Sequence, residues 1–128
     1  MKCLDTTFLI DFLRGKTPFC ELPPNIYCTT QINVYELFFG IHRIESGHKE
    51  KRLESAEGLL QQITVLPFSD IATRKAAEIT ASLMSKGLDI GQNDGITAAI
   101  ALSNNITIIV TKDIEHFKRI PGISVEKY

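Results

Sequence analysis

Two short segments, residues 2–5 and 107–110, limit most strongly what this chain can fold into. Each contains consecutive apolar residues, Cys3-Leu4 in the first and Ile108-Ile109-Val110 in the second, and both are too short for a core helix. Such runs are typical of strands that are buried on both faces of a parallel sheet. Asp5 ends the first segment, and Thr111 and Asp113 follow the second. Since ligands of open α/β sheets bind at the carboxyl ends of the strands, we expect a functional site there.

Helical patterns separate these segments from three further strand candidates. Further strands are predicted at residues 25–29, 64–66 and 123–125. Helices are predicted at residues 7–14, 49–62, 70–86 and 94–103. A further helix is predicted to follow a cap at Thr29 or Thr30, and a short helical turn is predicted after Asp113. Strands that alternate with helices predict an α/β fold, with a central, mainly parallel sheet of four to five strands and helices on both faces.

Length and composition indicate one folded domain. The 128 residues, 44% of them hydrophobic, are enough for a single core spanning 1–128. The odd number of cysteines (Cys3, Cys20 and Cys28) favours buried free thiols over a disulfide. We see neither a signal peptide nor a run of roughly 20 apolar residues, so we expect a cytoplasmic protein without a membrane span. A net charge of −1 leaves the partner undecided.

Two helices carry further expectations. In the segment after Thr30 we expect Gly40 to interrupt the helix and Gly47 to end it. In the helix 70–86 the periodicity predicts an inward stripe of Ile71, Ala72, Ala76, Ile79, Leu83 and Met84. Phe38, Phe39 and Ile41 offer apolar surface that would serve a dimer contact, a contact with a protein partner or the core.

Four acids are expected at the same edge of the sheet. Asp5 and Asp113 follow strands, and Glu36 and Asp94 lie near the starts of helices. Each has an ordinary explanation: a helix cap or dipole partner for Asp5 and Asp94, a solvent-facing position for Glu36, a turn for Asp113. These explanations do not account for the predicted meeting of all four at one edge.

Clustered carboxylates predict a divalent cation. Neighbouring carboxylates raise one another's pKa, and a hard cation relieves their repulsion. Oxygen ligands favour Mg²⁺, with Mn²⁺ as a plausible substitute. Zinc is disfavoured, because His42, His48 and His116 lack ligand spacing and only His116 could lie near this edge. Such a metal can activate water and stabilise charge on a phosphodiester, whereas no nucleophile–histidine motif or phosphate-binding glycine loop is present.

The chain resembles the PIN domains, specifically the VapC-like toxin ribonucleases of prokaryotic toxin–antitoxin pairs. The resemblance rests on Leu4-Asp5-Thr6, Tyr35-Glu36-Leu37 with Gly40, Ile90-Gly91-Gln92-Asn93-Asp94, Val110-Thr111-Lys112-Asp113 and Phe117-Lys118-Arg119-Ile120-Pro121-Gly122. It covers nearly the whole chain. It implies an α/β/α sandwich, usually a homodimer, with Mg²⁺-dependent cleavage of RNA and a paired antitoxin that blocks the site.

Site residues follow from this resemblance by position. The catalytic and metal-binding acids are Asp5, Glu36, Asp94 and Asp113. Many relatives have Asn at the position of Asp113 and an acid at that of His116, so Glu115 is a possible substitute or addition. Thr6 and Thr111 occupy the positions of hydroxyls that orient the carboxylates. Asn93 is expected to bind substrate or water, and Lys112 to contact a phosphate of the RNA.

Two other functions remain open from the sequence. The first is a PIN-like module that binds protein or RNA without turnover; an incomplete set of acids would indicate it. The second is another Mg²⁺-dependent phosphoryl-transfer enzyme, of haloacid-dehalogenase or response-regulator type. The haloacid-dehalogenase pattern requires a second Asp two residues after the first, where this chain has Thr7.

Overall fold

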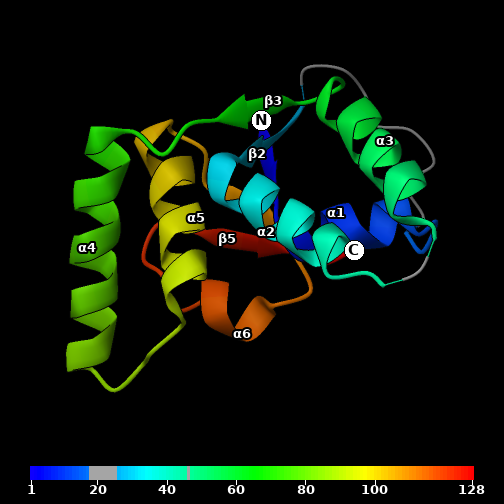
Figure 1. Cartoon of the computed structure of the whole chain (residues 1–128). Helices are drawn as coiled ribbons and strands as arrows, with labels where there is room; N and C mark the ends of the chain where they lie inside the picture. Colours follow the sequence, from blue (N-terminus) through cyan, green and yellow to red (C-terminus); the bar gives the residue numbers. More distant parts are fainter. Residues whose placement is uncertain (18–25, 46) are drawn as a thin grey trace.

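A single parallel sheet forms the centre of the molecule (Figure 1). The computed structural model describes residues 1–17, 26–45 and 47–128. In these residues the strands are β1 (Lys2–Leu4), β2 (Tyr27–Thr30), β3 (Thr64–Leu66), β4 (Ile108–Val110) and β5 (Ser124–Glu126). They form a five-stranded sheet in the order β3-β2-β1-β4-β5, with every pair parallel. The predicted α/β class and parallel sheet are confirmed.

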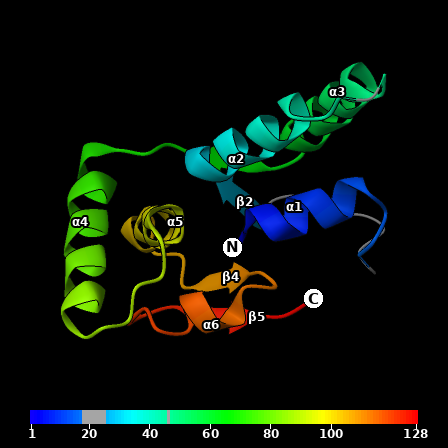
Figure 2. The same cartoon turned by 60° about the horizontal axis from the view of Figure 1, so that its bottom comes forward.

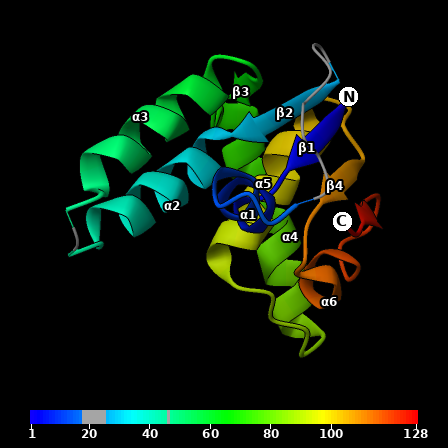
Figure 3. The same ribbon diagram turned by 90° about the vertical axis from the view of Figure 1, so that its right-hand side faces the viewer.

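The order of the strands reverses beside β1. This strand lies between β2 and β4 (Figure 3), with Cys3 opposite Cys28 on one side and Leu4 opposite Val110 on the other. The chain continues outward to β3 on one side and to β5 on the other. At such a reversal the connections leave the sheet in opposite directions and open a crevice at the carboxyl ends of the strands. Asp5 and Thr111, the residues after β1 and β4, therefore border this crevice.

Helices cover both faces of the sheet (Figure 2). The helices are α1 (Thr6–Leu13), α2 (Gln31–His42), α3 (Lys49–Leu60), α4 (Asp70–Ser85), α5 (Gln92–Ser103) and α6 (Ile114–Phe117). Successive strand residues point to opposite faces. Accordingly, Cys3 and Ile109 join the core formed with α4, α5 and α6, whereas Leu4 and Val110 join the core formed with α1, α2 and α3. The result is an α/β/α sandwich.

Small residues let α5 approach both the sheet and α4. Ala98, Ala99 and Ala101 are fully buried. A Cβ atom added to Gly95 would lie only 2.8 Å from the Oγ1 atom of Thr80 in α4, so a glycine is needed for this close contact. Because Gly95 follows Asp94 directly, the packing of α5 against α4 also fixes the position of the acid.

Three expectations about the helices were wrong. The helix α2 continues through Gly40 and ends at His42, before Gly47. Ile71 and Met84 are 71% and 61% exposed. The helix α4 buries only Ala72, Ala76, Ile79 and Leu83, because it packs with one narrow stripe against α5.

The cysteines behave as buried thiols where the structure describes them. Cys3 and Cys28 are neighbours across β1 and β2, and both are free and buried. Cys20 lies outside the described residues. Within the described ranges, every helix is too short or too polar to cross a membrane.

Candidate metal centre

Asp5 is buried at the carboxyl end of β1 with both carboxylate oxygens held. It is only 3% exposed. Its Oδ2 atom accepts hydrogen bonds from the hydroxyls of Thr111 (2.8 Å) and Thr7 (3.4 Å), and its Oδ1 atom accepts one from the Nδ2 atom of Asn33 (3.1 Å). Although Asp5 occupies the N-cap position of α1, its side chain makes no capping hydrogen bond. Capping therefore does not explain this acid.

Asn33 is the residue that organises this part of the site, and the sequence interpretation missed it. Its Oδ1 atom accepts hydrogen bonds from the hydroxyls of Thr30 (2.7 Å) and Thr29 (3.4 Å). Because only the oxygen of an amide side chain can accept hydrogen bonds from hydroxyls, these contacts fix which end of the Asn33 amide points toward Thr29 and Thr30. The Nδ2 atom then faces Asp5, the hydroxyl of Thr6 (2.9 Å) and the hydroxyl of Thr97 (3.3 Å).

Glu36 is connected to the same network through Thr6. It lies on α2 one turn after Asn33 and is partly buried. The hydroxyl of Thr6 donates to the Oε1 atom of Glu36 at 2.8 Å while accepting from Asn33. Glu36 therefore faces the crevice rather than open solvent. A signal for Asn33 was present in the sequence: it stands three residues before Glu36 and so lies on the same face of the helix.

Asp94, Asp113 and His116 form the other half of the site. The Nδ1 atom of His116 lies 2.9 Å from an oxygen of Asp94 and 2.9 Å from an oxygen of Asp113. One potential ligand atom from each of the three residues falls within 4.8 Å of the other two. Asp94 lies in the first turn of α5, and Asp113 precedes α6 without capping it. The sequence interpretation noted that His116 could lie near this edge and that it stands where many relatives have an acid, but did not name it as a ligand.

Electrostatic interactions connect the two halves. Burial raises the pKa of Asp5, hydrogen bonds from Thr111 and the backbone counteract this, and the charge of Glu36 raises it further. Burial raises the pKa of Asp94 to about 7, His116 opposes the shift, and the charges of Asp5 and Asp113 add to it. Asp94 in turn raises the pKa of His116, chiefly through their hydrogen bond. Each acid thus faces at least one other.

The donor set fits a divalent cation. In the described part of the chain, neither lysine nor arginine forms an ion pair with Asp5, Glu36, Asp94 or Asp113. Clustered carboxylates without cationic side chains are expensive to ionise. A hard cation removes this cost and binds carboxylate oxygens well. The raised pKa of Asp94 reflects this cost, because burial and the neighbouring charges of Asp5 and Asp113 disfavour its ionised form.

The remaining predicted residues lie around this cluster. Glu115 is exposed and pairs with Lys118 at 2.7 Å, so the geometry favours Asp113 over Glu115 as the fourth acid. Asn93 is partly buried and lines a shallow pocket beside Asp94. Lys112 pairs with Asp11 and lies over the ring of Tyr128, at 5.3 Å from the ring centre. The roles of Lys112 and Asn93 in RNA binding stay predictions.

Comparison with known sequences places this fold and site in a family. The sequence model of the PIN domain matches residues 2–123. The "tRNA(fMet)-specific endonuclease VapC" of Salmonella typhimurium is 32% identical over 129 residues, which cover 98% of this chain and 96% of that protein. "Ribonuclease VapC2" of Rickettsia felis is 33% identical over 81% of this chain and 75% of its own length.

Solved structures agree with the sequence relatives. The VapBC complex of Salmonella typhimurium bound to DNA contains a chain that matches with a TM-score of 0.87 and 29% identity, over 98% of this chain and 96% of that one. The VapBC2 complex of Rickettsia felis, bound to a DNA fragment from its promoter, gives a TM-score of 0.84 at 25% identity, over 99% and 98%. The chain therefore belongs to the PIN-domain family, within the branch that contains the VapC ribonucleases.

Proposed function

We propose that this chain is a metal-dependent endoribonuclease toxin and that all 128 residues form its single catalytic domain. Asp5, Glu36, Asp94 and Asp113 are the residues that would hold Mg²⁺ or Mn²⁺. The proposal is carried by two groups of acids at the crevice beside β1 and β4. Asp94 and Asp113 meet at His116, and Asp5, which interacts electrostatically with both Glu36 and Asp94, connects the groups. In the described residues none of these four carboxylates forms an ion pair with a lysine or arginine. A complete set of acids argues against a non-catalytic binding module.

The side chains of the site have separable tasks. When bound, the cation would supply an activated water and stabilise negative charge on the phosphate. Thr111 and Asn33 hold the two oxygens of Asp5, so this carboxylate reaches the site in one orientation. Thr6 holds one oxygen of Glu36 through a hydrogen bond from its hydroxyl. A site oriented in advance loses little free energy to reorganisation when the substrate arrives.

RNA is the proposed substrate. The relatives named ribonucleases and the tRNA(fMet)-specific endonuclease support this class and make transfer RNA the first substrate to test. Single-stranded loops are the parts of such an RNA that a protein can reach with side chains. Asn93 and Lys112 border the acid cluster and are the proposed contacts to the RNA.

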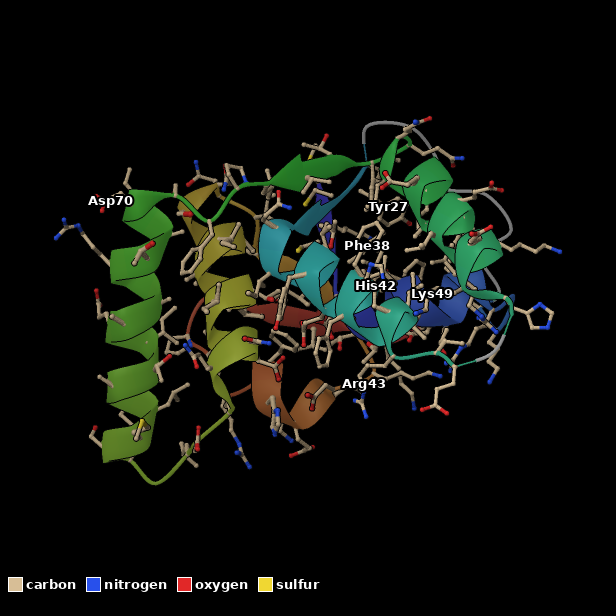
Figure 4. The ribbon with its side chains drawn as sticks, viewed as in Figure 1. Tyr27, Phe38, His42, Arg43, Lys49 and Asp70 are labelled. Carbon is tan, nitrogen blue, oxygen red and sulfur yellow. The ribbon has the colours of Figure 1, made fainter. Side chains whose placement is uncertain are left out.

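The test compares RNA cleavage by the metal-stripped protein before and after Mg²⁺ is added. The substitution Asp5→Asn keeps the shape of the side chain and removes its charge, so we expect a loss of cleavage of more than about 100-fold. Asp70→Asn, on the exposed start of α4 (Figure 4), is the matched control and should cleave normally. Unchanged cleavage by Asp5→Asn, or full cleavage with a chelator present, would contradict the proposal.

An antitoxin is the proposed protein partner, since the similar solved chains belong to VapBC complexes. A groove of about 520 Å³ between α1, α2 and α3 has an apolar floor that includes Leu37 and Ile41 and basic residues that include Arg14 and Arg52. Its chemistry suits an amphipathic segment with acidic side chains. With the protein encoded in the adjacent reading frame as the probe, Arg52→Glu should weaken binding at least about tenfold. Arg74→Glu, on α4, should not.

The dimer and the cellular location remain proposals as well. We propose a cytoplasmic homodimer. Phe39 is 52% exposed and stacks on Tyr35, so it offers apolar surface for a contact. Ile41, by contrast, is buried in the core of α1, α2 and α3, which is one of the three roles left open for it by the sequence. Light scattering of the purified protein measures the oligomeric state, and a monomer at all concentrations would contradict the dimer.

A further inference from the structure

The side chain of His116 is placed among the acids by the packing of α6. Its neighbour Phe117 is fully buried and Ile120 is almost so, and both anchor this segment in the core. Asp113 stands three residues before His116, on the same side of the helical turn. The ring itself is 40% exposed, while its Nδ1 atom faces two carboxylates. The nitrogen is therefore held at the site by the backbone around it.

The spacing of the three atoms matches one coordination sphere. Nδ1 of His116 lies 2.9 Å from the Oδ2 atom of Asp94 and 2.9 Å from the Oδ2 atom of Asp113. Ligands at neighbouring corners of an octahedron with bonds of about 2.1 Å stand about 3 Å apart. Two of the three separations therefore match neighbouring corners of one octahedron, and all three residues offer a ligand atom within 4.8 Å of the others.

We propose that His116 is a direct ligand of the cation, together with Asp94 and Asp113, and that this centre prefers Mn²⁺ and other first-row transition metals to Mg²⁺. The inference rests on the proposed function and adds a nitrogen donor to a set of acids that the sequence presented as oxygen-only. Imidazole nitrogen binds transition metals more strongly than it binds Mg²⁺, whereas carboxylate oxygen binds both. The identity of one residue on α6 would then set the metal preference of the whole site.

A spectroscopic test reads the nitrogen ligand without any substrate. Untagged, metal-stripped protein is given less than one equivalent of Mn²⁺, and pulsed electron paramagnetic resonance records the ¹⁴N modulation of the bound ion. We expect the modulation of a directly bound imidazole in the native protein and its loss in His116→Gln. His42→Gln is the matched control: His42 is exposed at the end of α2 (Figure 4), and this variant should keep the signal.

A competition titration measures the consequence for metal choice. Mn²⁺ and Mg²⁺ are titrated against each other in the native protein, His116→Gln and His42→Gln. Loss of the nitrogen ligand should lower the preference for Mn²⁺ over Mg²⁺ by about tenfold or more in His116→Gln alone, in line with the cost of disturbing a metal site. An unchanged preference in that variant would overturn the inference.

The outcomes separate this inference from the function beneath it. In one outcome, the native protein binds Mn²⁺ tightly, Asp94→Asn loses this binding, and the native spectrum shows no imidazole nitrogen. This result would overturn the role of His116 as a ligand and leave the proposed metal-dependent ribonuclease function standing. In the other outcome, the native protein binds neither Mn²⁺ nor Mg²⁺, or Asp94→Asn binds them as well as the native protein does. Either result would overturn the proposed function and the inference together.

Discussion

The two halves of the acid cluster are held in different ways. Asp5 and Glu36 accept hydrogen bonds from neutral groups, namely the amide of Asn33 and the hydroxyls of Thr6 and Thr111. Asp94 and Asp113 share one titratable partner, His116. Asp5 is buried and Glu36 partly buried, whereas the side chains of the second half are between 20% and 40% exposed.

This difference indicates which half depends on the cation. Neutral donors hold a carboxylate in place at any metal concentration, since their hydrogen bonds do not require a change of charge. In the second half, burial and neighbouring charges raise the pKa of Asp94 to about 7, so a proton or a metal must compensate for its charge. We therefore expect the first half to be organised before metal binds, and the second to be completed by it.

Removing Asn33 should have the largest effect on stability. Asn33→Ala takes away the amide that contacts Asp5, Thr6 and Thr97 and leaves buried groups without partners. We expect the free energy of unfolding to fall by about 2–4 kcal/mol, measured by urea denaturation. RNA cleavage should fall as well, because Asp5 and Glu36 lose their common support.

Asn104→Ala is the control for this change. The side chain of Asn104 also donates one hydrogen bond, to the carbonyl of Ile100 at 2.8 Å, but the residue is exposed at the end of α5. Its loss should cost less than about 1 kcal/mol. Equal effects of the two variants would mean that the network around Asp5 is no more important than a surface hydrogen bond.

Thr111→Val tests one hydroxyl of the first half. The substitution keeps the shape of a fully buried side chain and removes the 2.8 Å hydrogen bond to Asp5. We expect a loss of about 2 kcal/mol in the free energy of unfolding and a further rise in the pKa of Asp5. Thr107→Val, at an exposed position just before β4, is the control and should change stability by less than about 0.5 kcal/mol.

The same contrast explains how far the sequence could be interpreted. Asp5 and Asp113 could be predicted because parallel strands bring their carboxyl ends to one edge whatever the side chains do. The spacing to Glu36 places Asn33 on the same helix face but does not reveal its role, because its partners come from β2, α1 and α5 and meet only in the folded chain. Periodicity misplaced Ile71 and Met84 for a similar reason: it identifies an apolar face and does not say how wide a stripe the neighbouring helix covers.

The second half should make stability depend on pH when no metal is present. The pKa of Asp94 is about 7 in the folded chain against an ordinary value of 3.8, so the folded state holds the proton more tightly. A raised pKa of this kind contributes stability below that value, and the contribution is lost as pH rises through it. The metal-free protein should therefore lose about 1 kcal/mol between pH 6 and pH 8.

Thermal denaturation at both pH values measures this loss, and added Mg²⁺ or Mn²⁺ provides the comparison. A cation that takes the place of the proton should raise the melting temperature more at pH 8 than at pH 6. Asp94→Asn should show a weaker dependence on pH and a smaller effect of metal. A metal-free protein that is more stable at pH 8 than at pH 6 would contradict this account of the second half.

Lys112 lies just outside both halves, and its replacement should have the smallest effect on stability. Its ion pair with Asp11 is partly exposed, so Lys112→Gln should cost less than about 1 kcal/mol. If Lys112 leaves this pair to bind a phosphate, Lys112→Gln will raise the KM for RNA and leave kcat nearly unchanged. Asp11→Asn, which frees the lysine, should lower the KM or leave it as it is. A rise in KM in both variants would mean that RNA binding depends on the intact ion pair and not on the free charge of Lys112. The reason is that both variants lose the ion pair, whereas only Lys112→Gln loses the lysine charge.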